Sequence, residues 1–324
     1  MEADLNISLN GFQSEDDANK VGHLALEIIR TLEKRENLNI SKLKSILISY
    51  DFQSALDSIA SKFNYKSDVT YTNTNQAQAV GKVLSNIGNN GTYSEHAIIL
   101  DVNFFAGYIL ADFSLEAEFI SPIIHKLHHE LVHIHERNIL KNLDVSMSVG
   151  GYDDALLMLA TSAWSEYLAN YMSSSTATKN CIDGTLLTFE SALKEVPDEL
   201  IDLIYKYQTG QVELGDMFQT VKSGISLLCN LCAYSFGYIH GIKIDTKKHY
   251  PSLHELLDKT DLSQILLPLA EALDSLTGRL SNDGIGNYRD FDSVQQCIEN
   301  VYLYFGLRLE RTGENKLDLY VHVG

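Results

Sequence analysis

The sequence predicts an α+β protein in which a small sheet in the first third of the chain precedes a larger, mainly helical portion. Two observations support this fold class. The runs richest in β-forming residues lie before residue 110, and after it apolar residues recur mostly at helical spacing. The 324 residues also contain only four prolines, which suits long helices.

In the first third, helices and strands are expected to alternate. The polar and acidic residues 1–16 are interpreted as an irregular lead-in. Apolar residues at helical spacing predict a helix over 17–37, and the best strand of the chain is predicted over 96–105. The other elements expected here are a strand over 44–52, a short helix over 53–63, a second strand over 69–72, a helix over 75–87 and a turn over 86–91.

The remaining two thirds of the chain are predicted to be mostly helical. We find no internal repeat and no low-complexity segment, and no clear linker separates two domains. The run over 316–323 alternates weakly between apolar and polar residues and is interpreted as a final strand. Helices are expected over 114–140, 152–174, 186–207, 212–245, 252–277 and 290–308.

The charge balance argues against two kinds of partner. Lys plus Arg total 25 and Asp plus Glu total 43, so the formal net charge is −18. A nucleic-acid-binding surface needs a basic footprint, and anionic lipids attract basic segments. We therefore expect this chain to bind neither nucleic acid nor a membrane.

The N-terminal sequence and the small number of cysteines both favour a cytoplasmic protein. The N-terminal residues lack the apolar stretch of a signal peptide, and no apolar run approaches the length of a membrane span. Four cysteines are too few for a disulfide framework in a chain of this size. We therefore expect a cytoplasmic protein. Cys229 and Cys232 form a CxxC sequence inside an apolar helical run and are interpreted as core cysteines.

The most informative motif is the run His129–His133, which reads HELVH and matches HExxH. On a helix, His129 and His133 lie one turn apart on the same face, where two imidazoles can bind one Zn²⁺. Glu130 is then placed to act on a zinc-bound water. The motif therefore predicts a catalytic zinc site.

A helical wheel supports the assignment of this helix as a buried active helix. Apolar residues around Leu127 form one continuous face. His125, His129, His133 and Glu136 form a stripe on the opposite face. One side of the helix is thus suited to a core and the other to binding a metal.

Several residues around the motif leave alternatives open. His125, one turn before the motif, is an alternative third ligand. His128 and His135 lie off the stripe and are expected to be solvated or hydrogen-bonded to the backbone. Ser121 and Pro122 either begin the helix, as N-cap and first residue, or Pro122 kinks a longer helix.

A catalytic zinc usually has three protein ligands and one open position, so a third ligand is needed. Glu166 lies in the middle of a predicted helix, and Asn170 follows one turn later on the same face. Asn170 could hydrogen-bond a ring nitrogen of a ligand histidine. The alternative is an exposed Glu on an amphipathic helix beside a packing face of small residues. That face consists of Ser162, Ala163, Ala169 and Ser173.

Together, HELVH and the later run Glu166–Asn170 resemble the gluzincin zinc metallopeptidases, whose pattern is HExxH followed by Glu-x-x-Ala-Asn or a near variant. Within that clan, the short intracellular IrrE/ImmA-type peptidases are similar in the strand before the active helix and in ExxAN. The resemblance covers roughly residues 44–175. Ser165 precedes Glu166 at a position where some members have another polar residue, and this departure leaves the resemblance at the level of the clan.

The resemblance implies a role for each matching residue. His129, His133 and Glu166 would bind zinc. Glu130 would be the general base and then the proton shuttle to the leaving amine. The developing oxyanion needs a donor besides zinc, and in many gluzincins this is a Tyr or His from the helical half.

Tyr238 and His240 are the candidates for that oxyanion donor, in the run Tyr234–His240. They do not share a helical face, so at most one of them contributes. The alternative is that they are aromatic residues of a helical core.

The resemblance also implies how the chain is organised. The strand near 97–104 would be an edge strand that binds an extended peptide by strand addition. A minimal zincin-like catalytic core with an N-terminal lead-in is expected over 1–175. The resemblance does not extend to the helical portion over 176–324, which we expect to pack on that core.

Three functions are compatible with these patterns. The favoured one is a zinc-dependent metallopeptidase that hydrolyses peptide bonds of a protein or peptide substrate. The alternative is a non-catalytic sensor or protein-binding module on the same scaffold, with a structural or vestigial zinc site. The third is a zinc-free helical protein in which the motif arose by chance.

Overall fold

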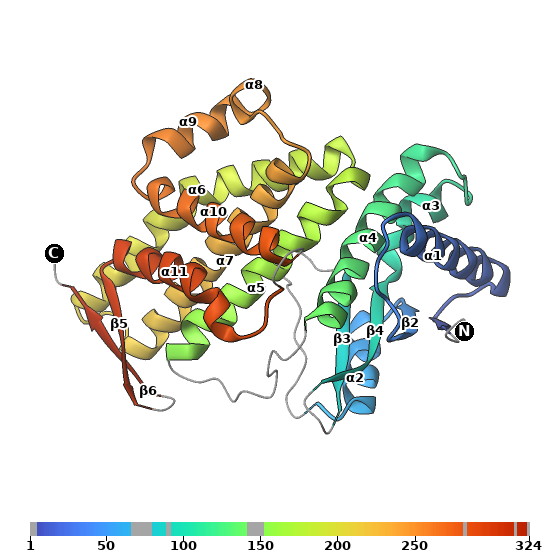
Figure 1. Ribbon diagram of the computed structural model, residues 1–324, viewed down its shortest axis with the longest axis horizontal. Coiled ribbons are helices and arrows are strands. Elements are labelled where there is room, and N and C mark those ends of the chain that lie inside the picture. The colour runs from blue at the N-terminus through green and yellow to red at the C-terminus, as the bar shows by residue number, and fades with distance from the viewer. Residues whose placement is uncertain are drawn as a thin grey trace. The chain divides into compact units, whose positions relative to one another are not determined.

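The computed structural model describes residues 5–65, 80–88, 92–140, 152–280, 284–313 and 316–322 (Figure 1). It confirms the α+β class, with strands and helices in the first part of the chain and mostly helices after it. The contacts divide the chain into two units. The first comprises Met1–Ser146 with Thr176–Thr178, and the second comprises Met147–Ser175 with Lys179–Gly324.

The first unit contains a four-stranded sheet in the order β1-β2-β4-β3. Its strands are β1 (Asn6–Asn10), β2 (Leu43–Ser49), β3 (Gly81–Ile87) and β4 (Tyr93–Asp101). The first, second and fourth strands along the chain run parallel, whereas β3 runs antiparallel to β4. This order makes β3 an edge strand and places β4 inside the sheet.

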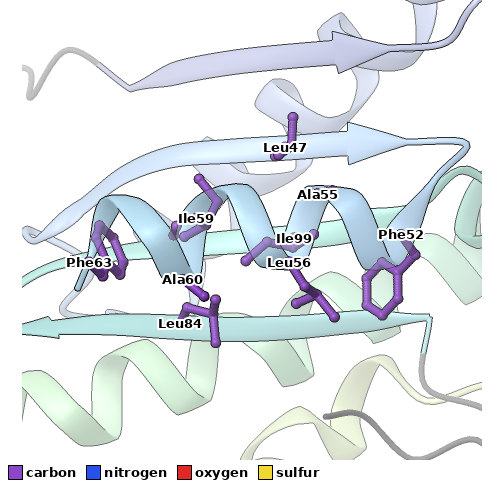
Figure 2. Close-up of a cluster of buried hydrophobic side chains, with 10 residues drawn as sticks. Leu47, Phe52, Ala55, Leu56, Ile59, Ala60, Phe63, Leu84 and Ile99 are labelled. Carbon is purple, nitrogen blue, oxygen red and sulfur yellow. The ribbon is translucent and has the colours of Figure 1, made fainter. Parts of the chain in front are cut away.

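One face of the sheet is covered by α2 (Phe52–Lys62). Asp51 caps this helix, since its side chain accepts a hydrogen bond from the Ser54 backbone N–H. Figure 2 shows the apolar cluster that α2 forms with β2, β3 and β4. Its members are Leu47, Phe52, Ala55, Leu56, Ile59, Ala60, Phe63, Leu84, Ala97 and Ile99.

The other face of the sheet lies against α4 (Ala117–Ile139). Side chains alternate between the faces of a strand, so Leu100 points away from Ile99 and the α2 cluster. Gly81 pairs with Leu100, and a Cβ on Gly81 would lie 3.0 Å from Oε1 of Glu130 on α4. The remaining helices of this unit are α1 (Glu15–Arg35), which contacts α4, η1 (Val102–Phe105) and α3 (Ala106–Leu110).

The second unit is built around α5 (Tyr152–Ser173) and α7 (Leu214–Gly241), which pack closely on each other. Of the predicted packing face of small residues on α5, Ala163, Ala169 and Ser173 are fully buried, whereas Ser162 is exposed. No described helix has the length and apolar character that crossing a membrane would need. The other elements from residue 174 on are η2 (Ser174–Thr176), α6 (Lys179–Gln208), α8 (Thr246–His249), α9 (Pro251–Lys259), α10 (Ser263–Leu280), η3 (Tyr288–Phe291), α11 (Asp292–Tyr304), β5 (Leu307–Gly313) and β6 (Lys316–Val321).

Several predicted elements differ from the structure. The lead-in contains β1, and the helix predicted over 75–87 is wrong for 81–87, which form β3. The helix predicted over 252–277 is two helices, α9 and α10, and the one predicted over 290–308 ends at Tyr304. The strand predicted over the tail is confirmed as β6, which pairs with β5. The strand predicted over 69–72 lies outside the described residues.

The error at β3 has a physical cause. Val80, Val83, Leu84 and Ile87 are spaced as on one face of a helix. In the structure Val83 and Leu84 are both buried, on opposite faces of the sheet, and β4 supplies the backbone partners. Burial on both faces removes the alternation that identifies a half-exposed strand.

The boundary between the two compact units differs from the one predicted at residue 175, because the second unit begins at Met147. That prediction placed the helix carrying Glu166 with the sheet. By its contacts, α5 belongs with α7, α10 and α11.

The close contact of α5 with α7 depends on Gly237. A Cβ at this position would lie 2.7 Å from the Tyr167 carbonyl oxygen and 2.8 Å from Cβ of Asn170. We expect Gly237→Ala to lower the free energy of unfolding by about 1–3 kcal/mol, because the two backbones must separate. Urea denaturation followed by circular dichroism measures this change.

The matched control is Gly184→Ala on α6, where a new Cβ meets no atom within 4 Å. This substitution should stabilise the protein by up to about 1 kcal/mol through helix propensity. Equal effects of the two substitutions would contradict the close contact at Gly237.

Candidate metal centre

The HELVH residues lie on α4, where the two histidine rings face each other. The Nε2 atoms of His129 and His133 are 3.2 Å apart. Their helical separation of four residues puts both rings on one side, as the motif predicted. Two neutral imidazole nitrogens this close can donate their lone pairs to one cation.

The opposite face of α4 holds this geometry in place. Leu127, Leu131 and Ile134 are fully buried, which confirms the predicted apolar face. The helix begins at Ala117, so Pro122 lies inside a longer helix and Ser121 is not its cap. Of the two alternatives for these residues, the longer helix is the one observed.

Glu166 lies in the middle of α5, flanked by the buried residues Trp164 and Tyr167. His129, His133 and Glu166 form a group that could hold a metal ion, with each residue offering one ligand atom. Two imidazole nitrogens and one carboxylate oxygen are a donor set that suits zinc. His125, the alternative third ligand, is outside this group, and its Nδ1 lies 3.4 Å from Oγ1 of Thr176.

Glu136 lies next to His133 on the same helix. Its Oε2 is 3.6 Å from Nδ1 of His133, and both side chains are nearly buried. A carboxylate at this ring nitrogen favours the tautomer that leaves Nε2 free for a metal. The sequence placed Glu136 on the metal-binding stripe without assigning it this position.

Glu130 lies against the first residue of β3. Because a Cβ at Gly81 would lie 3.0 Å from Oε1 of Glu130, the glycine gives this carboxylate its space. A glycine within a strand often marks such a close approach. The sequence does not reveal this contact, because the apolar spacing over 81–87 is that of a helix.

The predicted edge strand is also corrected by the sheet order. The strand near 97–104 was expected to be an edge, but β4 pairs with β2 on one side and with β3 on the other. Residues 102–105 continue as the 3₁₀ helix η1. The edge strand nearest to Glu130 is therefore β3.

Asn170 is buried on α5, one turn after Glu166. Its Nδ2 donates a hydrogen bond of 3.0 Å to the Tyr234 carbonyl oxygen on α7. This bond ties the two helices together. The hydrogen bond predicted between Asn170 and a ligand histidine stays a prediction.

The two oxyanion candidates lie in different surroundings on α7. Tyr238 is buried, and burial raises the pKa of its phenol. His240 belongs to a polar cluster in which Tyr167 Oη donates to Asp274 Oδ1 at 2.8 Å. Because that hydroxyl has one proton, Nδ1–H of His240 donates to Tyr167 Oη at 2.7 Å, which leaves its Nε2 as an acceptor. Their role towards an oxyanion stays a prediction.

The remaining cysteine and histidine predictions have mixed outcomes. Cys229 and Cys232 are fully buried, which confirms them as core cysteines, and burial raises the pKa of Cys229 to about 12. His135 accepts a hydrogen bond from the Asn39 backbone N–H, as predicted. For His128 the prediction is wrong. It is fully buried, its Nδ1 lies 3.0 Å from the Thr176 hydroxyl, and burial lowers its pKa to about 4.

Comparisons with known proteins do not place this chain in a family. No family model matches it, and no curated protein or solved structure matches it. Functional inference therefore rests on the residues and their geometry.

A directed chain of hydrogen bonds lies between the C-terminal part of α4 and the sheet. Arg137 donates to Ser85 Oγ at 2.7 Å, so the Ser85 hydroxyl can donate to Nδ1 of His96 at 2.7 Å. Nε2–H of His96 then donates to Asn138 Oδ1 at 3.1 Å. This arrangement requires neutral His96, and its burial lowers its pKa to about 4.

The depressed pKa of His96 predicts a pH-dependent stability. Between about pH 6.5, the pKa of an unfolded histidine, and pH 4, the unfolded chain binds a proton that the folded chain excludes. The free energy of unfolding should therefore fall as the pH falls through this window. His96→Gln, which cannot titrate, should make that dependence less steep in urea denaturation at a series of pH values, while the contribution of His128 remains. Identical slopes for the two proteins would contradict the assignment.

Proposed function

We propose that this chain is a zinc-dependent metallopeptidase that hydrolyses peptide bonds in a protein or peptide substrate. The observation that carries the proposal is the pair His129 and His133, whose Nε2 atoms are 3.2 Å apart on a helix that also carries Glu130. Glu166 completes a group of three residues that would hold the ion, and a catalytic zinc site with three protein ligands can also bind a water.

Zinc held by these residues would act as a Lewis acid, which would lower the pKa of a bound water and polarise the scissile carbonyl. The protein residues supply the proton transfers. Glu130 accepts the proton of the attacking water and passes it to the leaving amine. Glu130 follows His129 directly on α4, so it has the position of a base beside the metal and not that of a ligand.

The edge strand β3 supports a peptide as the substrate. Its first residue, Gly81, lies against Glu130, so an extended chain paired with this end of β3 would pass the base. The role first assigned to the strand near 97–104 therefore moves to β3.

The proposed activity agrees with the resemblance to gluzincin peptidases of the IrrE/ImmA type. That resemblance consists of HELVH and of Glu166 and Asn170 at the spacing ExxAN. We further propose that the protein acts in the cytoplasm without binding nucleic acid, as its net charge of −18 suggests.

Metal content and cleavage together test the proposal. Glu130→Gln should keep one zinc per chain and lower the cleavage rate about 100-fold or more, because only the base is lost. Glu166→Ala should lose zinc, because it removes one ligand. Elemental analysis measures the metal, and proteomic comparison of cells carrying wild type or Glu130→Gln identifies the substrates.

The outcomes separate the candidate functions. A Glu130→Gln protein that cleaves as well as wild type would refute the role of the base. A wild-type protein that binds zinc and cleaves nothing would favour the non-catalytic sensor. A gently purified protein without stoichiometric metal would favour a chance motif.

The position of Glu136 generates a separate prediction about metal affinity. We expect Glu136→Gln to weaken Zn²⁺ binding about 10–100-fold, since the carboxylate orients the His133 ring. Competition with a chromophoric chelator measures the affinity without any substrate. The control is Glu118→Gln, an exposed position in the first turn of the same helix, which should leave the affinity unchanged. Equal affinities of the two variants would count against the role of Glu136.

A further inference from the structure

Along the outward edge of β3, side chains already bind some of the backbone N–H and carbonyl groups, and the other groups are left for pairing. Asp101 N–H donates to the Val80 carbonyl oxygen at 2.9 Å, so the even-numbered residues here turn their backbone groups toward β4. Gly81, Val83 and Ser85 therefore direct theirs outward, where a further strand would pair.

Tyr65 occupies the outward groups of Ser85. Its hydroxyl donates to the Ser85 carbonyl oxygen at 3.0 Å and accepts from the Ser85 N–H at 3.3 Å. One phenol thus satisfies both backbone groups that an added strand would need at this residue.

Arg137 occupies the outward carbonyl of Val83. Its guanidinium donates to the Val83 oxygen at 3.2 Å and holds Ser85 Oγ at 2.7 Å with the same nitrogen. Arg137 lies about two helical turns after Glu130 on α4, so the base and this cap face β3 from one side of the helix.

Beside Glu130 the edge remains open. Within the described part of the chain, the outward groups of Gly81 and the N–H of Val83 have no hydrogen-bond partner. Alternate residues of a strand present these groups about 6.8 Å apart, so they can pair with about three residues of a peptide.

We infer that Tyr65 and Arg137 are specificity-determining residues that stop substrate pairing at Val83. This inference rests on the proposed peptidase function and deepens it. The substrate is a peptide segment that runs extended along β3 for about three residues on one side of the scissile bond and gains no backbone pairing beyond them. A chain end, or a segment that turns away after that point, meets this requirement.

The experiment uses the zinc-loaded full-length protein and a proteome-derived peptide library to map cleavage sites. Nested synthetic peptides around one site are then extended residue by residue on each side. For wild type, kcat/KM should stop rising after about three residues on one side. In Tyr65→Phe, which loses only the hydroxyl, the rise should continue, by about fivefold for each backbone hydrogen bond gained at Ser85.

Tyr50→Phe is the matched control. Tyr50 is an exposed tyrosine after β2 whose ring meets that of Phe12 edge to face, and its substitution should leave the length profile unchanged. Amide hydrogen exchange provides a readout without substrate, in which Ser85 N–H should exchange faster in Tyr65→Phe and not in Tyr50→Phe.

The outcomes test separately the Tyr65 hydrogen bonds, the role of Tyr65 in specificity and the peptidase function. If the Ser85 N–H exchanges equally fast in wild type and Tyr65→Phe, the Tyr65 hydroxyl does not protect it and the inference is overturned. If the two proteins cleave with the same length profile, Tyr65 has no role in specificity. Both leave the peptidase function intact. Absence of any cleavage by the zinc-loaded wild type would overturn the proposed function and this inference with it.

Discussion

The burial of one apolar face of α4 is the constraint on which the candidate metal centre depends. Leu127, Leu131 and Ile134 are fully buried, so the helix cannot rotate about its axis without exposing them to water. That fixed rotation holds His129 and His133 on the opposite side with their Nε2 atoms 3.2 Å apart. The fold therefore orients the two rings towards one point, and such fixed orientation favours a tight metal site.

The same rotation of α4 organises β3. Glu130 reaches the beginning of the strand, where Gly81 leaves room for its carboxylate. Arg137 reaches the middle of the strand and binds the Val83 carbonyl and Ser85. The Ser85 hydroxyl in turn donates a hydrogen bond to the neutral ring of His96. The other ring nitrogen of His96 donates to Asn138. Residues of α4 thus lie beside both parts of the β3 edge, the part with unpaired backbone groups at Gly81 and the part whose Val83 carbonyl is already bound.

In the second unit, close packing of two helices has a comparable role. Gly237 lets α7 approach α5 until their backbones nearly touch, and Asn170 donates a hydrogen bond to the Tyr234 carbonyl across that contact. Tyr167, next to Glu166, is held by His240 and Asp274. The part of α5 that carries Glu166 is therefore fixed on both sides by α7 and α10, which reduces the freedom of its backbone.

The sequence by itself determined the α+β class, the helix carrying HELVH and the residue types of the ligand group, because helical periodicity and motif spacing are local properties. It did not determine that 81–87 form a strand, since β4 supplies the pairing and burial on both faces hides the alternation. Only the tertiary structure made β3 the edge, placed Gly81 at Glu130, and brought Tyr65 and Arg137 onto its outward groups. These contacts join residues distant in the chain, and no local pattern encodes such a distance.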